Sequence, residues 1–164
     1  MYGYLENVFA FGKENFGFSW PNTPFNNGQE EYDETYFSTE QNEICPDGVL
    51  ASSYDAATQN WGGAWRMPTQ EDFAGLAALE EKGWDATNKG YRLTDANGNS
   101  IFFPAAGCGY GTDLSYADYG LYWSSSLDTG SPYCAFYLSF SNGNISAGSR
   151  SNRYYGYSVR PLSE

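Results

Sequence analysis

The stretch Tyr91–Phe103, YRLTDANGNSIFF, contains two runs of strand-forming residues on either side of an Asn-Gly pair. Tyr91–Thr94 and Ser100–Phe103 are rich in aromatic and aliphatic side chains, and Asn97-Gly98 is a pair that tight hairpin turns favour. The sequence therefore predicts an antiparallel hairpin, and this hairpin is the strongest indication of the class of fold.

The same pattern recurs towards the C-terminus. Ala135–Phe140 and Ile145–Ala147 flank a second Asn-Gly turn at Asn142-Gly143, which predicts another hairpin. Leu121–Ser125 and Tyr157–Val159 are further strand candidates.

Helices are expected upstream of the hairpins. Residues 51–60 predict a short helix ending at Gly62-Gly63, and Thr69 predicts the start of a stronger one with Asp72 as its capping-box partner. The expected apolar face of this helix is Phe73, Leu76, Ala77 and Leu79, and Gly83 is its expected stop. Residues 2–11 predict an aromatic strand, and residues 12–50 predict a long loop. This order of elements predicts an α+β fold.

Size and charge restrict the function. The chain has 164 residues, so we expect a single domain over residues 1–164. Its net charge of −12 disfavours nucleic-acid partners and anionic membrane surfaces. Because no long apolar run occurs and residues 1–20 lack the pattern of a signal peptide, we expect no membrane insertion and see no signal peptide.

The residues that carry most catalytic chemistry are missing. Histidine is absent, which removes Ser-His-Asp and Cys-His catalysis and most zinc sites. The acidic stretch Glu30–Glu34 is interpreted as a solvated loop, so we expect no metal and no cofactor. Cys45, Cys108 and Cys134 are compatible with one disulfide or with buried, free thiols. We expect that the chain is not an enzyme.

Composition changes sharply along the chain. Lys, Glu, Gln and Met occur 19 times in residues 1–95 but once in residues 96–164, where Tyr, Ser, Gly, Asn, Asp and Ala replace them. Random replacement of the adenines of an AAY asparagine codon reaches the enriched residue types but not Lys, Glu, Gln, Met or Trp, with Trp123 as the exception here. The bias therefore fits either adenine-directed diversification or a strand-and-turn region that favours Ser, Gly and Tyr.

Four stretches in this order carry a resemblance to a known family: NWGGAWRMPT (Asn60–Thr69), NGNSIFFPAAG (Asn97–Gly107), GLYWSSS (Gly120–Ser126) and RYYGYSVRPL (Arg153–Leu162). Together they resemble a C-type-lectin-fold family of gut bacteria and their phages, which includes the variable proteins of diversity-generating retroelements and is similar in fold to the formylglycine-generating enzyme. The resemblance implies a loop-rich C-type lectin-like domain, with two helices packed on short antiparallel sheets. It also implies a variable region at about residues 108–152, in which a retroelement mutates adenines.

The residues expected to contact a ligand come from this region. In CAFYLSFS, Phe136, Leu138 and Phe140 alternate with Tyr137, Ser139 and Ser141, so the second set is expected on the open face of a strand. All the residues expected to contact a ligand are predicted to lie in loops, at strand edges or on that open face. They are Tyr110, Asp113, Ser115, Tyr116, Asp118, Tyr119, Asp128, Ser131, Tyr133, Cys134, Tyr137, Ser139, Ser141, Ser146, Gly148, Ser149, Ser151 and Asn152. Tyr supplies large, rigid contacts and Ser supplies adaptable hydrogen bonds, as in antibody binding sites. The alternative is that these are solvated loop residues.

Other residues are expected to be structural. Trp61, Trp65 and Trp123 are interpreted as core aromatics, and Gly62, Gly63 and Gly107 as residues that permit turns or close packing. Arg66 and Arg160 are expected to bind backbone carbonyls or an acidic group. The tripeptides with which sugar-binding C-type lectins hold calcium do not occur.

Three functions remain open at this point. The resemblance implies a diversified receptor-recognition protein that binds a protein or cell-surface ligand and acts outside the cell, at a cell surface or on a virion. The alternatives are a fixed adhesin or surface-display module of the same fold, and a structural or assembly domain without a separate ligand.

Overall fold

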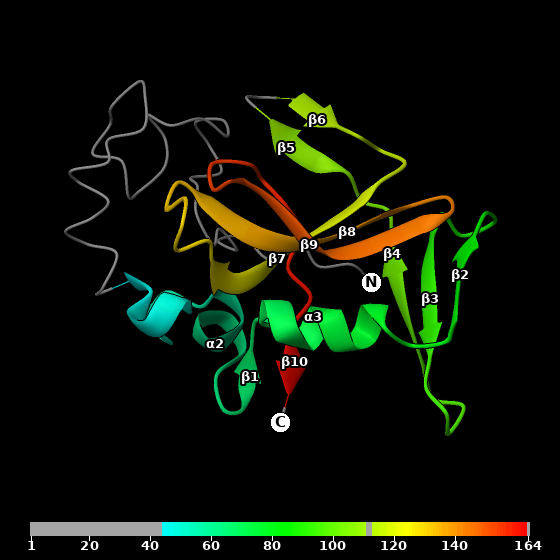
Figure 1. Cartoon of the computed structure of the whole chain (residues 1–164), viewed down its shortest axis with the longest axis horizontal. Helices are drawn as coiled ribbons and strands as arrows, with labels where there is room; N and C mark the ends of the chain where they lie inside the picture. Colours follow the sequence, from blue (N-terminus) through cyan, green and yellow to red (C-terminus); the bar gives the residue numbers. More distant parts are fainter. Residues whose placement is uncertain (1–43, 111–112, 164) are drawn as a thin grey trace.

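The computed structural model describes residues 44–110 and 113–163, which form a mixed α+β arrangement of small, antiparallel sheets and two α-helices (Figure 1). The predicted strand at residues 2–11 and the predicted loop up to residue 43 lie outside the described residues. The elements, in chain order, are η3 (Pro46–Gly48), α2 (Ala56–Trp61), β1 (Trp65–Arg66), α3 (Gln70–Ala77), β2 (Glu81–Asp85), β3 (Gly90–Thr94), β4 (Ser100–Pro104), β5 (Cys108–Tyr110), β6 (Asp113–Ser115), β7 (Gly120–Leu127), β8 (Cys134–Ser141), β9 (Asn144–Asn152) and β10 (Leu162–Ser163).

The sheet β7-β8-β9 lies between two hydrophobic cores. Neighbouring residues of a strand point to opposite faces, so Tyr122 enters one core and Trp123 the other. The Tyr122 core includes Phe73 of α3 and Phe103 of β4. The Trp123 core includes Met67 and residues around α2. Strand β7 is therefore buried along almost its whole length.

Both Asn-Gly hairpins are confirmed. Strands β3 and β4 pair antiparallel with Thr94 opposite Ser100, and β8 and β9 pair with Ser141 opposite Asn144. Strand β9 continues to Asn152, well beyond the predicted end at Ala147. The extension was missed because residues 148–152 are polar and glycine-bearing, and their strand conformation comes from pairing with β8.

The two helices differ from prediction at their ends. Helix α2 begins at Ala56, later than predicted, because the buried Asp55 carboxylate accepts hydrogen bonds from the Ala57 and Thr58 amides and caps it. The capping box of Thr69 and Asp72 is confirmed at the start of α3. Gly83 is not the stop of α3, because the helix ends at Ala77 and Gly83 lies in β2, opposite Arg92.

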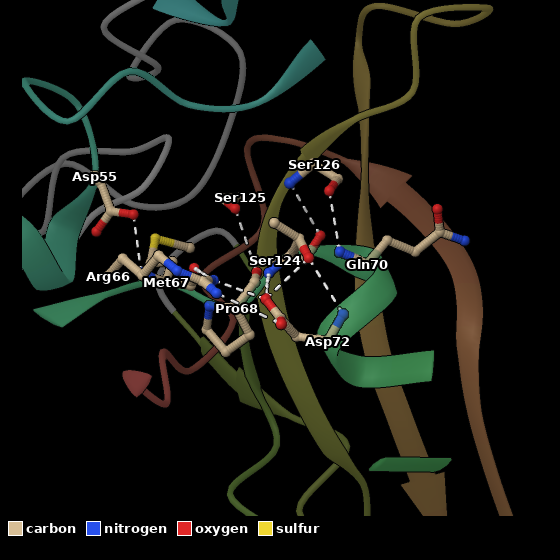
Figure 2. Close-up of polar contacts among 10 residues, drawn as sticks. Asp55, Arg66, Met67, Pro68, Gln70, Asp72, Ser124, Ser125 and Ser126 are labelled. Carbon is tan, nitrogen blue, oxygen red and sulfur yellow. Dashed lines mark hydrogen bonds and ion pairs between the residues drawn. The ribbon is translucent and has the colours of Figure 1, made fainter. Parts of the chain in front are cut away.

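A bulge in β7 joins the central sheet to segments distant in sequence (Figure 2). The Ser125 amide donates to the Pro68 carbonyl at 2.8 Å, and the Ser125 carbonyl accepts from the Leu50 amide at 2.9 Å. The Ser126 hydroxyl accepts from the Gln70 amide at 3.0 Å and so helps to cap α3. Figure 2 shows these serines converging on the start of α3.

Arg66 and Asp72 form an ion pair beside this bulge (Figure 2). An Arg66 nitrogen lies 2.7 Å from Asp72 Oδ2, and Arg66 also donates to the Met67 carbonyl, as expected for this arginine. The hydrogen bond from Arg66, followed by one from the Thr69 amide, lowers the pKa of Asp72 from 3.8 to about 2.

Several structural expectations were wrong. Trp123 is buried, but Trp61 and Trp65 are 45% and 40% exposed and pack edge-to-face on each other at the ends of short elements. Residues 157–159 make an isolated bridge at Ser158 instead of a strand, and the C-terminal pairing is between β10 and β1. Arg160 lies over the Phe103 ring, with its guanidinium carbon 5.7 Å from the ring centroid, and not in the carbonyl or acid contact expected for it.

Gly120 is required for close packing in the Tyr122 core. A Cβ at this position would lie 1.8 Å from Phe140 Cζ, so Gly120→Ala should destabilise the fold by about 1–3 kcal/mol, the usual range for overpacking. The measurement is the free energy of unfolding from chemical denaturation. Gly83→Ala is the matched control, because it also lies in a strand and its Cβ would meet nothing within 4 Å. Equal effects of the two variants would contradict the packing role of Gly120.

Asp72 should make the fold sensitive to acid. Its pKa is lower in the folded state than in the unfolded chain, so its stabilising contribution is complete above pH 3.8 and is lost as the pH falls towards about 2. Thermal unfolding of Asp72→Asn should therefore show a shallower loss of stability over this interval than the parent chain. Glu71→Gln removes the same charge from the same helical turn and should leave the slope closer to that of the parent.

Candidate ligand-binding surface

A continuous series of aromatic rings runs outwards from the buried Trp123. We call Tyr110, Tyr137, Tyr154, Tyr155 and Tyr157 the tyrosine cluster. Trp123 stacks on Tyr157 with ring centroids 4.4 Å apart, and Tyr157 is followed by Tyr155 at 5.7 Å. Tyr155 in turn stacks on Tyr110 at 5.3 Å, and Tyr110 is 50% exposed. The cluster thus connects the Trp123 core with the solvent.

Hydrogen bonds and ring contacts between four segments hold the cluster together. Gly109 of β5 and Gly156 exchange two backbone hydrogen bonds, of 2.8 and 3.0 Å, which bring Tyr110 beside Tyr155. The Trp123 indole nitrogen donates to the Tyr155 carbonyl at 3.0 Å. Tyr137 comes from β8, and its ring centroid lies 4.9 Å from that of Tyr157.

Serine hydroxyls accompany these rings on strands β8 and β9. Ser149 lies opposite Tyr137 in the β8–β9 ladder, and its hydroxyl lies 2.9 Å from that of Ser139. The Ser139 hydroxyl also lies 3.5 Å from the Ser146 carbonyl. The arrangement presents aromatic faces and hydroxyl groups side by side, a combination suited to adaptable contact with another molecule.

Burial keeps the inner phenols in their neutral form. Burial raises the pKa of Tyr137, although hydrogen bonds with Ser149 and Tyr157 act in the opposite direction. Burial likewise raises the pKa of Tyr157, against a hydrogen bond with Ser151. The pKa of Tyr155 is raised by burial and then by its hydrogen bond with Tyr154. At neutral pH these groups act as uncharged hydrogen-bonding groups.

The hairpin β5–β6 and the turn after it form a second exposed apolar group. Leu114 is 70% exposed, Tyr116 63% and Tyr119 46%, and the rings of the two tyrosines pack edge-to-face. Tyr116 has a φ of 57°, a left-handed conformation that bulky residues seldom adopt. Gly107, with φ of 68°, leaves room for the Ser115 carbonyl, which a Cβ would approach to 2.4 Å.

The structure brings only part of the predicted set together. Tyr137, Ser139, Ser146, Ser149 and Ser151 share one region of the β8–β9 ladder, and Tyr110 joins them through Tyr155. Asn152 also reaches the cluster, because its side-chain amide donates to the Tyr154 hydroxyl at 3.5 Å. The other members lie elsewhere: Asp113, Ser115 and Tyr116 in or next to β6, Asp118 in an exposed ion pair with Lys89, Tyr119 beside Tyr116, Ser131 and Tyr133 in the β7–β8 loop, and Ser141 and Gly148 at other positions of β8 and β9.

Two expectations of exposure were wrong. Asp128 is only 6% exposed, because its carboxylate binds the Gly130 amide and lies 2.7 Å from an Arg150 nitrogen. Cys134 is 8% exposed and lies within β8. Both residues support the fold at this position. The face carrying Tyr137 is also less open than predicted, because Tyr157 and Trp123 pack on that ring.

Sequence reasoning missed Tyr154, Tyr155 and Tyr157. These residues were assigned to a structural motif, Arg153–Leu162, and the expected variable region ended at residue 152. Three tyrosines within four positions match the composition of the predicted surface, and that density is the signal that could have indicated their role.

The three cysteines are free and buried. Burial raises the pKa of the Cys45 thiol to about 11, against the opposing charge of Arg153, and also raises the pKa of Cys108 and Cys134. Within residues 44–110 and 113–163, no group of three or more His, Cys, Asp or Glu residues is arranged to hold a metal ion. Over the same residues, no helix has the length and apolar character needed to cross a membrane.

Comparison of the chain with models of known protein families, with curated proteins and with solved structures found no match.

The raised phenol pKa values should make the fold sensitive to alkali. The unfolded chain releases these protons near pH 10, before the folded protein does, so the free energy of unfolding should fall as the pH rises past about 10. Tyr157→Phe should reduce that slope in denaturation experiments between about pH 9 and about pH 12. Tyr119→Phe makes the same change at an exposed ring outside the cluster and should have a smaller effect. Identical slopes for both variants would contradict the role assigned to Tyr157.

Proposed function

We propose that this chain is a receptor-recognition protein that binds a protein or cell-surface ligand through the tyrosine cluster and the serines of β8 and β9. The observation that carries the proposal is the unbroken ring series from Trp123, which is 2% exposed, to Tyr110, which is 50% exposed. Rings held by a core lose little conformational freedom on binding, and this lowers the entropic cost of association.

Charge supports a protein ligand over a polyanion. The chain has a net charge of −12, and the exposed cation nearest the β8–β9 surface, Arg150, is engaged with Asp128. A nucleic acid or an anionic membrane would need several unengaged cations on one face. Tyrosine and serine, by contrast, are the side chains that antibody-like surfaces use against proteins. No catalytic role is included in this proposal, because the three thiols are buried and the chain has no histidine.

The finer identity is also proposed here. The four sequence stretches that resemble variable proteins of diversity-generating retroelements support a C-type lectin-like fold displayed outside the cell, at a cell surface or on a virion. The described arrangement supports this, since two helices lie against small antiparallel sheets (Figure 1). The depletion of Lys, Glu, Gln and Met after residue 95 is the composition that adenine-directed mutation would leave.

Sequencing of the genomic DNA beside the gene tests this proposal. We expect a near-copy of the codons for residues 108–162, differing from them at adenines, and a reverse-transcriptase gene nearby. The differences should fall at codons for side chains of the surface, such as Tyr110, Tyr137 and Ser149. They should be absent at Leu138 and Phe140, which alternate with the surface residues and fill the Tyr122 core.

Two outcomes would contradict parts of the proposal. If no near-copy and no reverse transcriptase are found, diversification is excluded and a fixed adhesin of the same surface becomes the better interpretation. If the differing codons include Leu138 and Phe140 as often as Tyr137 and Ser149, the assignment of the surface is wrong even though diversification occurs.

A further inference from the structure

The described residues contain two Asn-Gly turns, and both are exposed to solvent. Asn97-Gly98 joins β3 to β4, and Asn142-Gly143 joins β8 to β9. All four residues are exposed, and Gly98 and Gly143 both have positive φ, 83° and 100°. A Cβ on either glycine would meet nothing within 4 Å, so neither turn is crowded. The third Asn-Gly pair of the sequence, Asn27-Gly28, lies outside the described residues.

An Asn-Gly pair can undergo an intramolecular reaction at such a turn. The glycine backbone nitrogen attacks the asparagine side-chain carbonyl carbon, a new C–N bond closes a succinimide ring, and the amide nitrogen leaves as ammonia with the displaced proton. Water then adds to one of the two imide carbonyls and breaks one C–N bond, which gives aspartate or isoaspartate. Glycine favours this reaction because it has no side chain to obstruct the approach.

Hydrogen bonds at the first turn oppose this reaction. The Gly98 amide, which would be the attacking nitrogen, donates to the Asp95 carbonyl at 3.0 Å. The Asp95 carboxylate accepts from the Asn97 amide at 2.8 Å and from the backbone and side chain of Asn99, each at 2.9 Å. Attack by the Gly98 nitrogen requires that its hydrogen bond breaks and that the network around Asp95 shifts.

The second turn has no comparable network. Its ends are fixed by the pairing of Ser141 with Asn144, but within the described residues neither the Gly143 amide nor the Asn142 side chain has a hydrogen-bond partner. We propose that Asn142 is a site of spontaneous deamidation in the folded protein, while Asn97 is protected. The reaction needs only water as co-reactant.

The product would change the hairpin tip chemically and sterically. Either product adds a carboxylate beside Ser141, at the end of β8. Isoaspartate also carries the main chain through the former side chain, which adds one methylene to the turn that sets the β8–β9 register. Ageing of the molecule would thus introduce heterogeneity next to the serines of β8.

Peptide mapping of the aged full-length chain tests the proposal. No Lys or Arg lies between Arg92 and Arg150, so trypsin leaves both turns on one peptide, and a protease that cleaves after aromatic residues is needed to separate them. During incubation at about neutral pH, mass spectrometry should show deamidation at Asn142 about fivefold faster or more than at Asn97, the factor that one net hydrogen bond corresponds to. Enzymatic carboxyl methylation identifies the isoaspartate fraction.

Two controls make the comparison decisive. In a urea-unfolded sample the two sites should react at similar rates, because the Asp95 network is then absent. The folded Asp95→Ala variant removes the carboxylate contacts to Asn97 and Asn99 but keeps the backbone carbonyl that binds the Gly98 amide, so deamidation at Asn97 should accelerate in part while that at Asn142 does not change. The proposal is overturned if folded Asn97 reacts as fast as folded Asn142, or if Asn142 stays intact while the unfolded chain reacts.

Discussion

The backbone hydrogen bonds of Ser125 connect parts of the chain that are far apart in sequence. One bond reaches Pro68, just before α3, and the other reaches Leu50, before α2. They are available because the bulge in β7 turns Ser125 away from its ladder partner on β8. Ser125 is only 3% exposed, so either bond, if broken, would leave a polar group buried without a partner. The arrangement of both helices on the central sheet depends on this short bulge.

The central sheet also supports the candidate ligand-binding surface. Strand β7 is covered on both faces, and its Trp123 face is covered partly by the segment that carries Tyr155 and Tyr157. The tyrosine cluster is therefore the outermost layer of a core. Its inner members contribute to stability by packing on Trp123, whereas the Tyr110 side chain is half exposed and contributes less buried area. Because of this geometry, substitutions should destabilise the fold most at Trp123 and progressively less towards Tyr110.

Local chemistry explains which features could be predicted from the sequence. Turn residues and capping residues act through neighbouring backbone groups, so both Asn-Gly hairpins and the Thr69 capping box were predicted correctly. Long-range contacts explain the errors. The length of β9 is set by β8, and the exposure of Trp61 and Trp65 follows from their place on short elements with few neighbours. In the candidate site, too, local features were predicted and long-range contacts were not. The two-residue alternation of strand β8 identified Tyr137 and Ser139. Tyr155 lies beside Tyr110 because of the long-range contact between Gly109 and Gly156, which the sequence pattern does not reveal.

The three buried thiols have a consequence for where the protein can fold. Cys45, Cys108 and Cys134 each fill space in the interior, and no disulfide joins any two of them. Because no disulfide is part of the fold, formation of the native state requires no oxidant and no disulfide-exchange catalyst. The burial that raises their pKa values also hinders their oxidation. The same three-dimensional structure is therefore compatible with synthesis in a reducing compartment and with later residence in an oxidising one.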